Sequence, residues 1–141
     1  MQEYVCGFCL SPEKDRVVLI KKTKPAWQNG LLNGVGGKIE SNELPIEAMV
    51  REFREETSVE ILATEWFEFA EIEGTSLVDK WKVYFFATYC PNIDMVKTTT
   101  EEEVLILSIS NLNSLPVINN LRWLIPMALD VNHWYCKAIA V

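Results

Sequence analysis

Three glutamates with helical spacing lie near the middle of the chain, at Glu52, Glu55 and Glu56. Positions i, i+3 and i+4 fall on one face of an α-helix, with Cβ atoms about 5–6 Å apart. Carboxylates this close repel one another, and no lysine occurs between Glu40 and Asp79 to relieve the repulsion. Because hard divalent cations prefer carboxylate oxygens, the cluster predicts a site for Mg²⁺, with Mn²⁺ as a substitute.

The residues before and within this segment predict how such a helix is presented. Pro45 suits the first helical position, and Ser41 and Asn42 offer side-chain oxygens for capping. An apolar stripe at helical spacing lies about 120° around the helix from the carboxylates. Its members are Ile46, Met49, Val50 and Phe53. We therefore expect one face to pack on a core while the other faces a cleft.

The helix and the glycines before it form a longer pattern of fixed spacing. Gly37, five residues, Glu43 and seven residues are followed by REFREETSV at positions 51–59. This pattern resembles the Nudix box, G-x5-E-x7-R-E-U-x-E-E-x-G-U, in which U is apolar. Every fixed position matches except Ser58, where the family has a glycine that ends the helix in a left-handed turn. We expect this serine to cost about 1 kcal/mol of strain.

The resemblance to the Nudix family, and to its MutT-like (8-oxo-dGTP diphosphatase-like) group, implies roles for these residues. Glu52 is the general-base candidate, although base and ligand roles stay open because neighbouring carboxylates titrate as a coupled set. Arg51 lies four residues from both Glu47 and Glu55, so it can pair with either and hold a carboxylate in place. The residues implied in catalysis are Arg51, Glu52, Glu55 and Glu56, and the implied metal ligands are Glu52, Glu55, Glu56, Glu103 and the carbonyl oxygen of Gly36.

The acidic ligand outside the box belongs to the run TTEEE at positions 99–103. Glu103, just before an apolar strand, is the match that the MutT-like group implies, and Glu102 is the second choice. The alternative is that this run is only a solvated polar loop.

Basic residues for the phosphates are expected at two places. Lys38 completes a GGK segment like that of the family, which implies a phosphate contact. Lys21 and Lys22 end a strand near where MutT-like relatives place a basic phosphate ligand, and one of them is expected to point inward. The alternative for this pair is a solvated strand end.

Base recognition is expected from two asparagines and a tryptophan. Asn33 begins the segment NGVGGK, which resembles a stretch of 8-oxo-dGTP hydrolases whose asparagine contacts the purine. Asn119 ends the segment PVIN, which is similar to a Pro-x-x-Asn segment that reads the purine edge in bacterial MutT. Either asparagine could instead be structural, as a turn residue at Asn33 or a helix cap at Asn119. Trp27 and Trp123 could stack on a base, although tryptophan more often packs in a core or its rim.

Length and composition predict one globular domain spanning residues 1–141. The chain is 49% hydrophobic and 23% charged, and its net charge of −7 argues against a broad nucleic-acid or membrane surface. No signal peptide or membrane span is apparent, so we expect a cytoplasmic monomer or homodimer whose partner is a small nucleotide. The four cysteines, Cys6, Cys9, Cys90 and Cys136, are expected to be reduced and mostly buried, in preference to a zinc or redox site.

Hydrophobic patterning predicts an α+β fold, an α/β/α sandwich with a central mixed sheet. Such a fold, with a catalytic loop-helix-loop and a C-terminal helix, is also what the Nudix resemblance implies. The C-terminal helix contains Pro126, so it should either begin near this residue or be kinked there. Strands are expected at 3–10, 16–22, 60–73, 80–90, 103–109 and in the tail 133–141.

These observations predict Mg²⁺-dependent hydrolysis of a nucleoside triphosphate to a monophosphate and pyrophosphate. Purine deoxynucleotides, including 8-oxo-dGTP, are the leading substrates. The alternative enzyme would cleave ADP-ribose or a dinucleoside polyphosphate, but residues 69–76 lack the proline or tyrosine that marks such members of the family. A non-catalytic nucleotide-binding module is the third hypothesis, and it is disfavoured because every glutamate of the box is retained.

Overall fold

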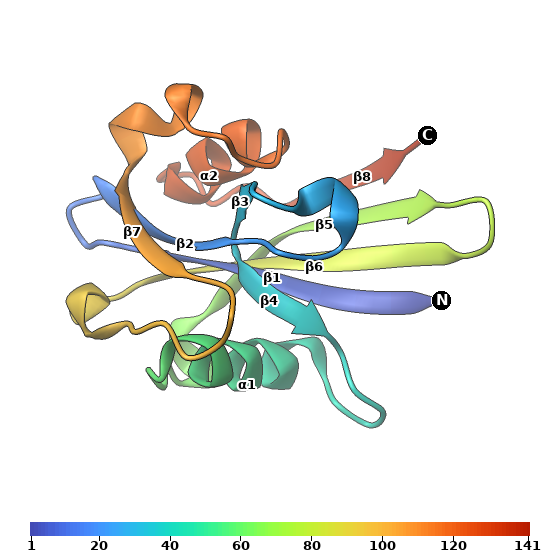
Figure 1. Cartoon of the computed structure of the whole chain (residues 1–141), viewed down its shortest axis with the longest axis horizontal. Helices are drawn as coiled ribbons and strands as arrows, with labels where there is room; N and C mark the ends of the chain where they lie inside the picture. The colour runs from blue at the N-terminus through green and yellow to red at the C-terminus, as the bar shows by residue number, and fades with distance from the viewer.

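A computed structural model describes all 141 residues, Met1–Val141. One eight-stranded mixed sheet forms the middle layer, with α1 on one face and α2 on the other (Figure 1). The α/β/α sandwich is therefore confirmed. The strands are β1 (Gln2–Leu10), β2 (Arg16–Lys21), β3 (Leu32–Asn33), β4 (Val35–Lys38), β5 (Phe67–Thr75), β6 (Lys80–Tyr89), β7 (Val104–Ser108) and β8 (Cys136–Ala140). The helices are α1 (Pro45–Thr57) and α2 (Leu121–Leu129), with 3-10 turns η1 (Ala26–Gln28), η2 (Ala63–Glu65), η3 (Ile93–Met95) and η4 (Ile109–Ser114).

Strand β1 is the organising strand of the sheet. The order is β3-β2-β1-β6-β5-β8, with β4 paired to β1 and β7 paired to β2. Strand β1 runs parallel to β6 and antiparallel to β2 and β4. Because successive side chains of a strand point to opposite faces, β1 contributes to two cores. Phe8 and Leu10 are buried in the core shared with α2, whereas Val5 and Cys9 are buried in the core shared with α1.

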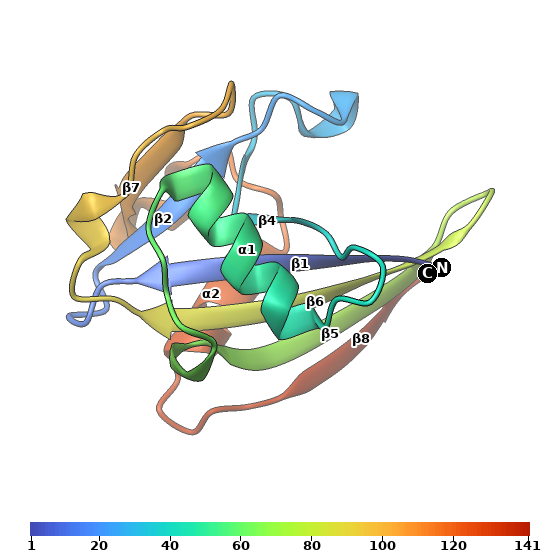
Figure 2. The same cartoon turned by 90° about the horizontal axis from the view of Figure 1, so that it is seen from below.

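Helix α1 lies across β1, β4 and β6 with its apolar stripe against the sheet (Figure 2). Met49 and Phe53 are fully buried there, as the helical spacing predicts. Pro45 occupies the first helical position, which is also as predicted. Capping by Ser41 or Asn42 is wrong, because Leu44 precedes the helix and its N–H donates to Glu47 Oε1 at 2.8 Å.

Some element boundaries differ from the expected ones. Residues 60–66 are not part of a strand, because η2 precedes β5, and β5 then continues to Thr75. The glycine-rich residues 35–38 form a strand that hydrophobic patterning did not reveal, since glycine has a low strand propensity. Helix α2 begins at Leu121 and includes Pro126, so the helix does not start at the proline. No helix is long and apolar enough to cross a membrane.

The cysteines are packed as small apolar groups. Cys6, Cys9 and Cys90 are buried and Cys136 is partly buried, and all four are free thiols. Burial raises the pKa of the Cys6 thiol to about 12, so this group stays protonated at neutral pH. The expected burial of Cys6 and Cys9 is confirmed.

Ser58 ends α1 in the left-handed conformation, with φ 64° and ψ 7°, and its N–H donates to the Arg54 carbonyl at 2.9 Å. Replacing it by glycine removes the steric cost of Cβ in this region, so Ser58→Gly should raise the free energy of unfolding by about 1 kcal/mol. Urea denaturation monitored by circular dichroism measures the change. Ser58→Ala keeps the Cβ and serves as the control. Equal stability of the glycine and alanine variants would contradict the assignment of strain to this turn.

Candidate metal and phosphate site

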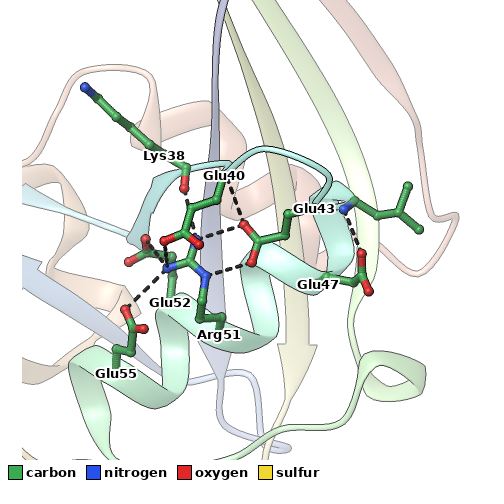
Figure 3. A network of polar contacts seen from close by, with 8 residues as sticks. Lys38, Glu40, Glu43, Glu47, Arg51, Glu52 and Glu55 are labelled. Carbon is green, nitrogen blue, oxygen red and sulfur yellow. Dashed lines mark hydrogen bonds and ion pairs between the residues drawn. The ribbon is translucent and has the colours of Figure 1, made fainter.

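The Arg51 guanidinium, with a side chain only 17% exposed, connects the helix to the loop before it (Figure 3). Its Nε and Nη2 donate to the two carboxylate oxygens of Glu43 at 2.7 and 2.9 Å, which is the strong two-point geometry of an arginine–carboxylate pair. Nη1 donates to Glu52 Oε1 at 2.9 Å and to Glu55 Oε2 at 3.3 Å. Nη2 also donates to the Lys38 carbonyl at 3.0 Å. One cation thus holds helix, loop and strand together.

The pKa values of two carboxylates in this network are shifted in opposite directions. Hydrogen bonding to Arg51 lowers the pKa of Glu43. Burial raises the pKa of Glu52, and the bond from Arg51 only partly offsets it. Of the two partners that helical spacing allowed for Arg51, Glu55 is used. Glu47 is not, because it accepts the N–H at the start of the helix.

Gly37 allows the Glu52 carboxylate to lie directly on strand β4. A Cβ atom at this glycine would come within 2.5 Å of Glu52 Oε1, which is closer than atoms can approach. Gly37 therefore leaves room for the Glu52 carboxylate, which Arg51 holds by a hydrogen bond of 2.9 Å.

Glu56 lies on the inner side of the helix and is half-buried, and its Oε2 is buried without any hydrogen-bond partner. Burial is the main reason that its pKa is raised to about 8, and the nearby Glu52 and Glu102 raise it further. Lys22 and the backbone of Gly36 act in the opposite direction. An unpaired carboxylate oxygen inside the protein indicates a place where a cation would be stabilised.

The loop before β7 brings Glu102, and not Glu103, to this carboxylate. This loop is hydrogen-bonded to the last turn of α1. The Lys97 N–H donates to the Thr57 carbonyl at 2.9 Å, and the Thr99 hydroxyl donates to the Glu55 carbonyl at 2.6 Å. Glu102 is 6% exposed, whereas the adjacent Glu103 is exposed. The structure therefore favours the second choice from the sequence.

The three lysines expected to contact phosphate differ in the direction of their side chains. Lys22 points inward, with 21% of its side chain exposed, and its Nζ lies 3.1 Å from Glu102 Oε1. Lys21 is exposed. Lys38 is also exposed, and its side chain extends away from the Arg51 network (Figure 3). Lys22 is therefore the inward-pointing lysine of the three.

The two segments expected to read a purine lie side by side. The Leu32 N–H donates to the Pro116 carbonyl at 2.8 Å, and the Ile118 N–H donates to the Leu32 carbonyl at 2.9 Å. Asn33 and Asn119, the neighbours of these bonded residues, are thus brought to one region.

The asparagine side chains and the tryptophans have distinct surroundings. Asn33 Oδ1 accepts the Gly34 N–H at 2.8 Å, and its Nδ2 donates to Gln28 Oε1 at 3.4 Å. Asn119 is exposed and does not cap α2, because the residue before that helix is Asn120 and makes no side-chain cap. The exposed fraction is 68% for Trp27 and 45% for Trp123, so neither is a core residue.

The donor atoms near Glu56 fit a hard divalent cation. They are the carboxylate oxygens of Glu52, Glu56 and Glu102, a donor type that Mg²⁺ and Mn²⁺ prefer over nitrogen or sulfur. Three acidic side chains do not converge on one point, because Arg51 draws Glu52 and Glu55 to one side while Lys22 draws Glu102 to the other. The Glu56 oxygen Oε2 stays without a partner in either group.

A cavity of about 350 Å³ lies elsewhere, where β5, the end of α2 and the turn after it meet. It is mostly aromatic and shares no residue with the carboxylate cluster. Its lining residues are Phe67, Glu68, Phe69, Met127, Ala128, His133, Trp134 and Tyr135.

The sandwich fold, the glycine strand and the carboxylate-bearing helix can be compared with those of known proteins. Residues 2–126 match the NUDIX domain family. The chain is 26% identical over 112 residues, covering 77% of this chain and 68% of the relative, to an uncharacterized Nudix hydrolase, YvcI, of Bacillus subtilis.

Solved structures show the same fold. A mutator MutT protein from Bacillus halodurans superposes with a TM-score of 0.75 at 17% identity, covering 100% of this chain and 91% of that one. The NUDIX domain of Shewanella oneidensis NrtR, solved with ADP ribose, gives a TM-score of 0.69 at 13% identity, covering 89% and 84%. The chain belongs to the Nudix family, and its fold is like that of MutT. Its class of reaction is hydrolysis of a phosphoanhydride in a nucleoside diphosphate-linked compound.

The Arg51–Glu43 pair predicts a pH-dependent stability. Because the pKa of Glu43 is lower in the folded protein, the pair stabilises the fold above the ordinary glutamate pKa of about 4.3, and this contribution is lost as the pH falls. Glu43→Gln should therefore reduce the free energy of unfolding by about 1 kcal/mol at pH 7 and by much less at pH 3. Glu40→Gln, at a carboxylate that is 3.7 Å from Arg51 and largely exposed, is the control and should change little. A difference between wild type and Glu43→Gln that does not depend on pH would refute the pairing.

Proposed function

We propose that this protein hydrolyses a nucleoside triphosphate to a nucleoside monophosphate and pyrophosphate. Mg²⁺ is the proposed cation, with Mn²⁺ as a substitute, and a purine deoxynucleotide such as 8-oxo-dGTP is the proposed substrate. The observation that carries the proposal is the orphaned carboxylate oxygen of Glu56, which is buried between Glu52 and the Lys22–Glu102 pair. This arrangement joins a cation site to a basic group suited to phosphate.

Residues around Glu56 would hold the cation, and Glu52 would handle the proton. Glu56, Glu102 and the Gly36 carbonyl are the proposed ligands, with Glu55 available when it leaves Arg51. A bound divalent cation supplies a water of lowered pKa and neutralises charge on the phosphate oxygens. Glu52 is the proposed general base, because its raised pKa brings proton affinity closer to neutral pH. Arg51 is a positioning residue that orients Glu52 through a 2.9 Å hydrogen bond.

Lys22 would contact the phosphate chain, and Lys38 would approach it from the solvent side. A flexible ammonium suits this task because it can follow a phosphate as a point charge. The inward direction of Lys22 and its low exposure support this assignment. Lys21 is left as a solvated residue at the strand end.

Selection of a purine would come from the region where β3 meets the segment 116–119. The exposed amide of Asn119 offers a donor and an acceptor, as the edge of a guanine requires, whereas the amide of Asn33 would exchange its 3.4 Å bond to Gln28 for the base. Trp27, exposed on the loop between β2 and β3, would provide an aromatic surface for the base. The backbone bonds between Leu32 and the 116–118 segment support this proposal, because they place both asparagines in one region.

A second candidate is cleavage of ADP-ribose or a dinucleoside polyphosphate. The NrtR NUDIX domain, which was solved with ADP ribose, shares the fold. ADP-ribose is therefore included among the nucleotides to be tested. The two candidates differ in their products, since only a triphosphate substrate yields pyrophosphate under the proposed reaction.

A nucleotide screen with Mg²⁺ and Mn²⁺, with products identified by chromatography, tests the proposal. We expect pyrophosphate and a purine monophosphate, and we expect Glu52→Gln to lower kcat by at least about 10²-fold while the circular dichroism spectrum is unchanged. Two monophosphates from ADP-ribose would support the second candidate. Near-wild-type turnover by Glu52→Gln would remove this residue from the mechanism.

The neighbouring acids Glu102 and Glu103 provide a matched pair of variants. Glu102→Gln should raise the Mg²⁺ concentration for half-maximal rate by about tenfold or more, because it removes a buried anion beside Glu56. Glu103→Gln removes the same charge at an exposed position and should change this concentration by less than about twofold. A Mg²⁺ titration of the rate measures both. The reverse ranking would return the ligand role to Glu103.

A further inference from the structure

The carboxylate of Glu102 is held from two sides by the start of the loop between β2 and β3. Oε2 accepts the Thr23 N–H at 2.7 Å and the Thr23 hydroxyl at 3.2 Å. Oε1 accepts only the Lys22 ammonium, at 3.1 Å. The side chains of this ion pair are 21% and 8% exposed, so the pair is largely shielded from water.

The backbone around Lys22 fixes the direction of its side chain. The Lys22 N–H donates to the Leu31 carbonyl, and the Lys22 carbonyl accepts the Gly30 N–H, both at 2.8 Å. These bonds extend the pairing of β2 beyond Lys21, so that adjacent residues alternate in direction. Lys21 is accordingly exposed while Lys22 points inward.

The ammonium of Lys22 is also the basic side chain that acts on Glu56, since Arg51 is bound to other carboxylates. The loop that carries Glu102 is bonded to the Glu55 and Thr57 carbonyls, on either side of Glu56. A single ammonium is therefore the positive charge that acts on both Glu102 and Glu56.

We propose that Lys22 is an internal counter-cation for this site, meaning that its ammonium stabilises Glu102 and Glu56 and is displaced when a divalent cation binds. The inference rests on the proposed function. It adds that the Lys22 ammonium and the metal ion compete for one oxygen, Glu102 Oε1. The displaced ammonium is then free to meet the phosphates. Binding of the cation and presentation of the phosphate ligand are thus coupled through one ion pair.

Thr23 has a separate role in this exchange, as a positioning residue. Its two hydrogen bonds hold Glu102 Oε2, so that loss of the Lys22 contact leaves the carboxylate correctly oriented. The two oxygens of Glu102 therefore differ in role. Oε2 is held by Thr23, and Oε1 can exchange the Lys22 ammonium for a metal ion.

Mn²⁺ binding without nucleotide, followed by the electron paramagnetic resonance signal of free Mn²⁺, tests the proposal without any turnover. Lys22→Met removes the competitor and should tighten Mn²⁺ binding by about fivefold or more. Lys21→Met removes an equal charge from the adjacent residue and should change the affinity by less than about twofold. Lys22→Arg keeps the charge and should bind Mn²⁺ much as the wild type does.

Equal Mn²⁺ affinity of Lys22→Met and Lys21→Met, or weaker binding by Lys22→Met, would overturn the inference and leave the proposed hydrolysis standing. Failure of the wild-type protein to bind Mn²⁺ would instead count against the proposed function itself.

A measurement on the unmodified chain covers the case in which Lys22→Met does not fold. During a Mg²⁺ titration of wild-type protein, the side-chain ¹³Cε resonance of Lys22 should shift as the ion pair opens, while that of Lys21 stays in place. An unmoved Lys22 resonance at saturating Mg²⁺ would show that the pair is not displaced.

Discussion

Repulsion among carboxylates is the constraint on which the rest of this site depends. Helix α1 and the loop before it place four of them around one guanidinium, that of Arg51, and its partners are Glu40, Glu43, Glu52 and Glu55. Coulomb repulsion between such charges is strong where water is scarce, so they can be gathered only if a cation is placed among them. Because the same guanidinium also binds the Lys38 carbonyl, this compensation fixes the helix against β4.

The sheet supplies the second half of this geometry. Strand β4 is short and rich in glycine, and its pairing with β1 places Gly36 and Gly37 opposite the helix. Gly37 admits the Glu52 carboxylate, and the backbone of Gly36 reaches Glu56. Met49 and Phe53, buried on the other side of α1, hold the helix at this distance from the sheet. The carboxylate face is therefore positioned by the packing of the apolar face.

Features with a strong periodic or spaced signal could be predicted from the sequence. The apolar stripe of α1, the left-handed turn at Ser58 and the sandwich architecture are of this kind. Features that depend on tertiary contacts could not be predicted from the sequence. Whether Glu102 or Glu103 faces inward depends on the strand register, because a shift of one residue exchanges the two faces. The main partner of Arg51 proved to be Glu43, eight residues away, because the loop folds back in a way that helical spacing does not describe.

The acidic side chains of α1 are divided between two cations, Arg51 and Lys22. Glu52 and Glu55 lie on the side of Arg51, where they are hydrogen-bonded and held. Glu56 lies on the side of Lys22 and Glu102, where one of its oxygens is buried and unpaired. A chain with a net charge of −7 attracts a nucleotide polyphosphate only where positive charge is concentrated locally. The inward ammonium of Lys22, together with a cation bound at Glu56, would concentrate that charge at the end of the helix where the phosphates are proposed to lie.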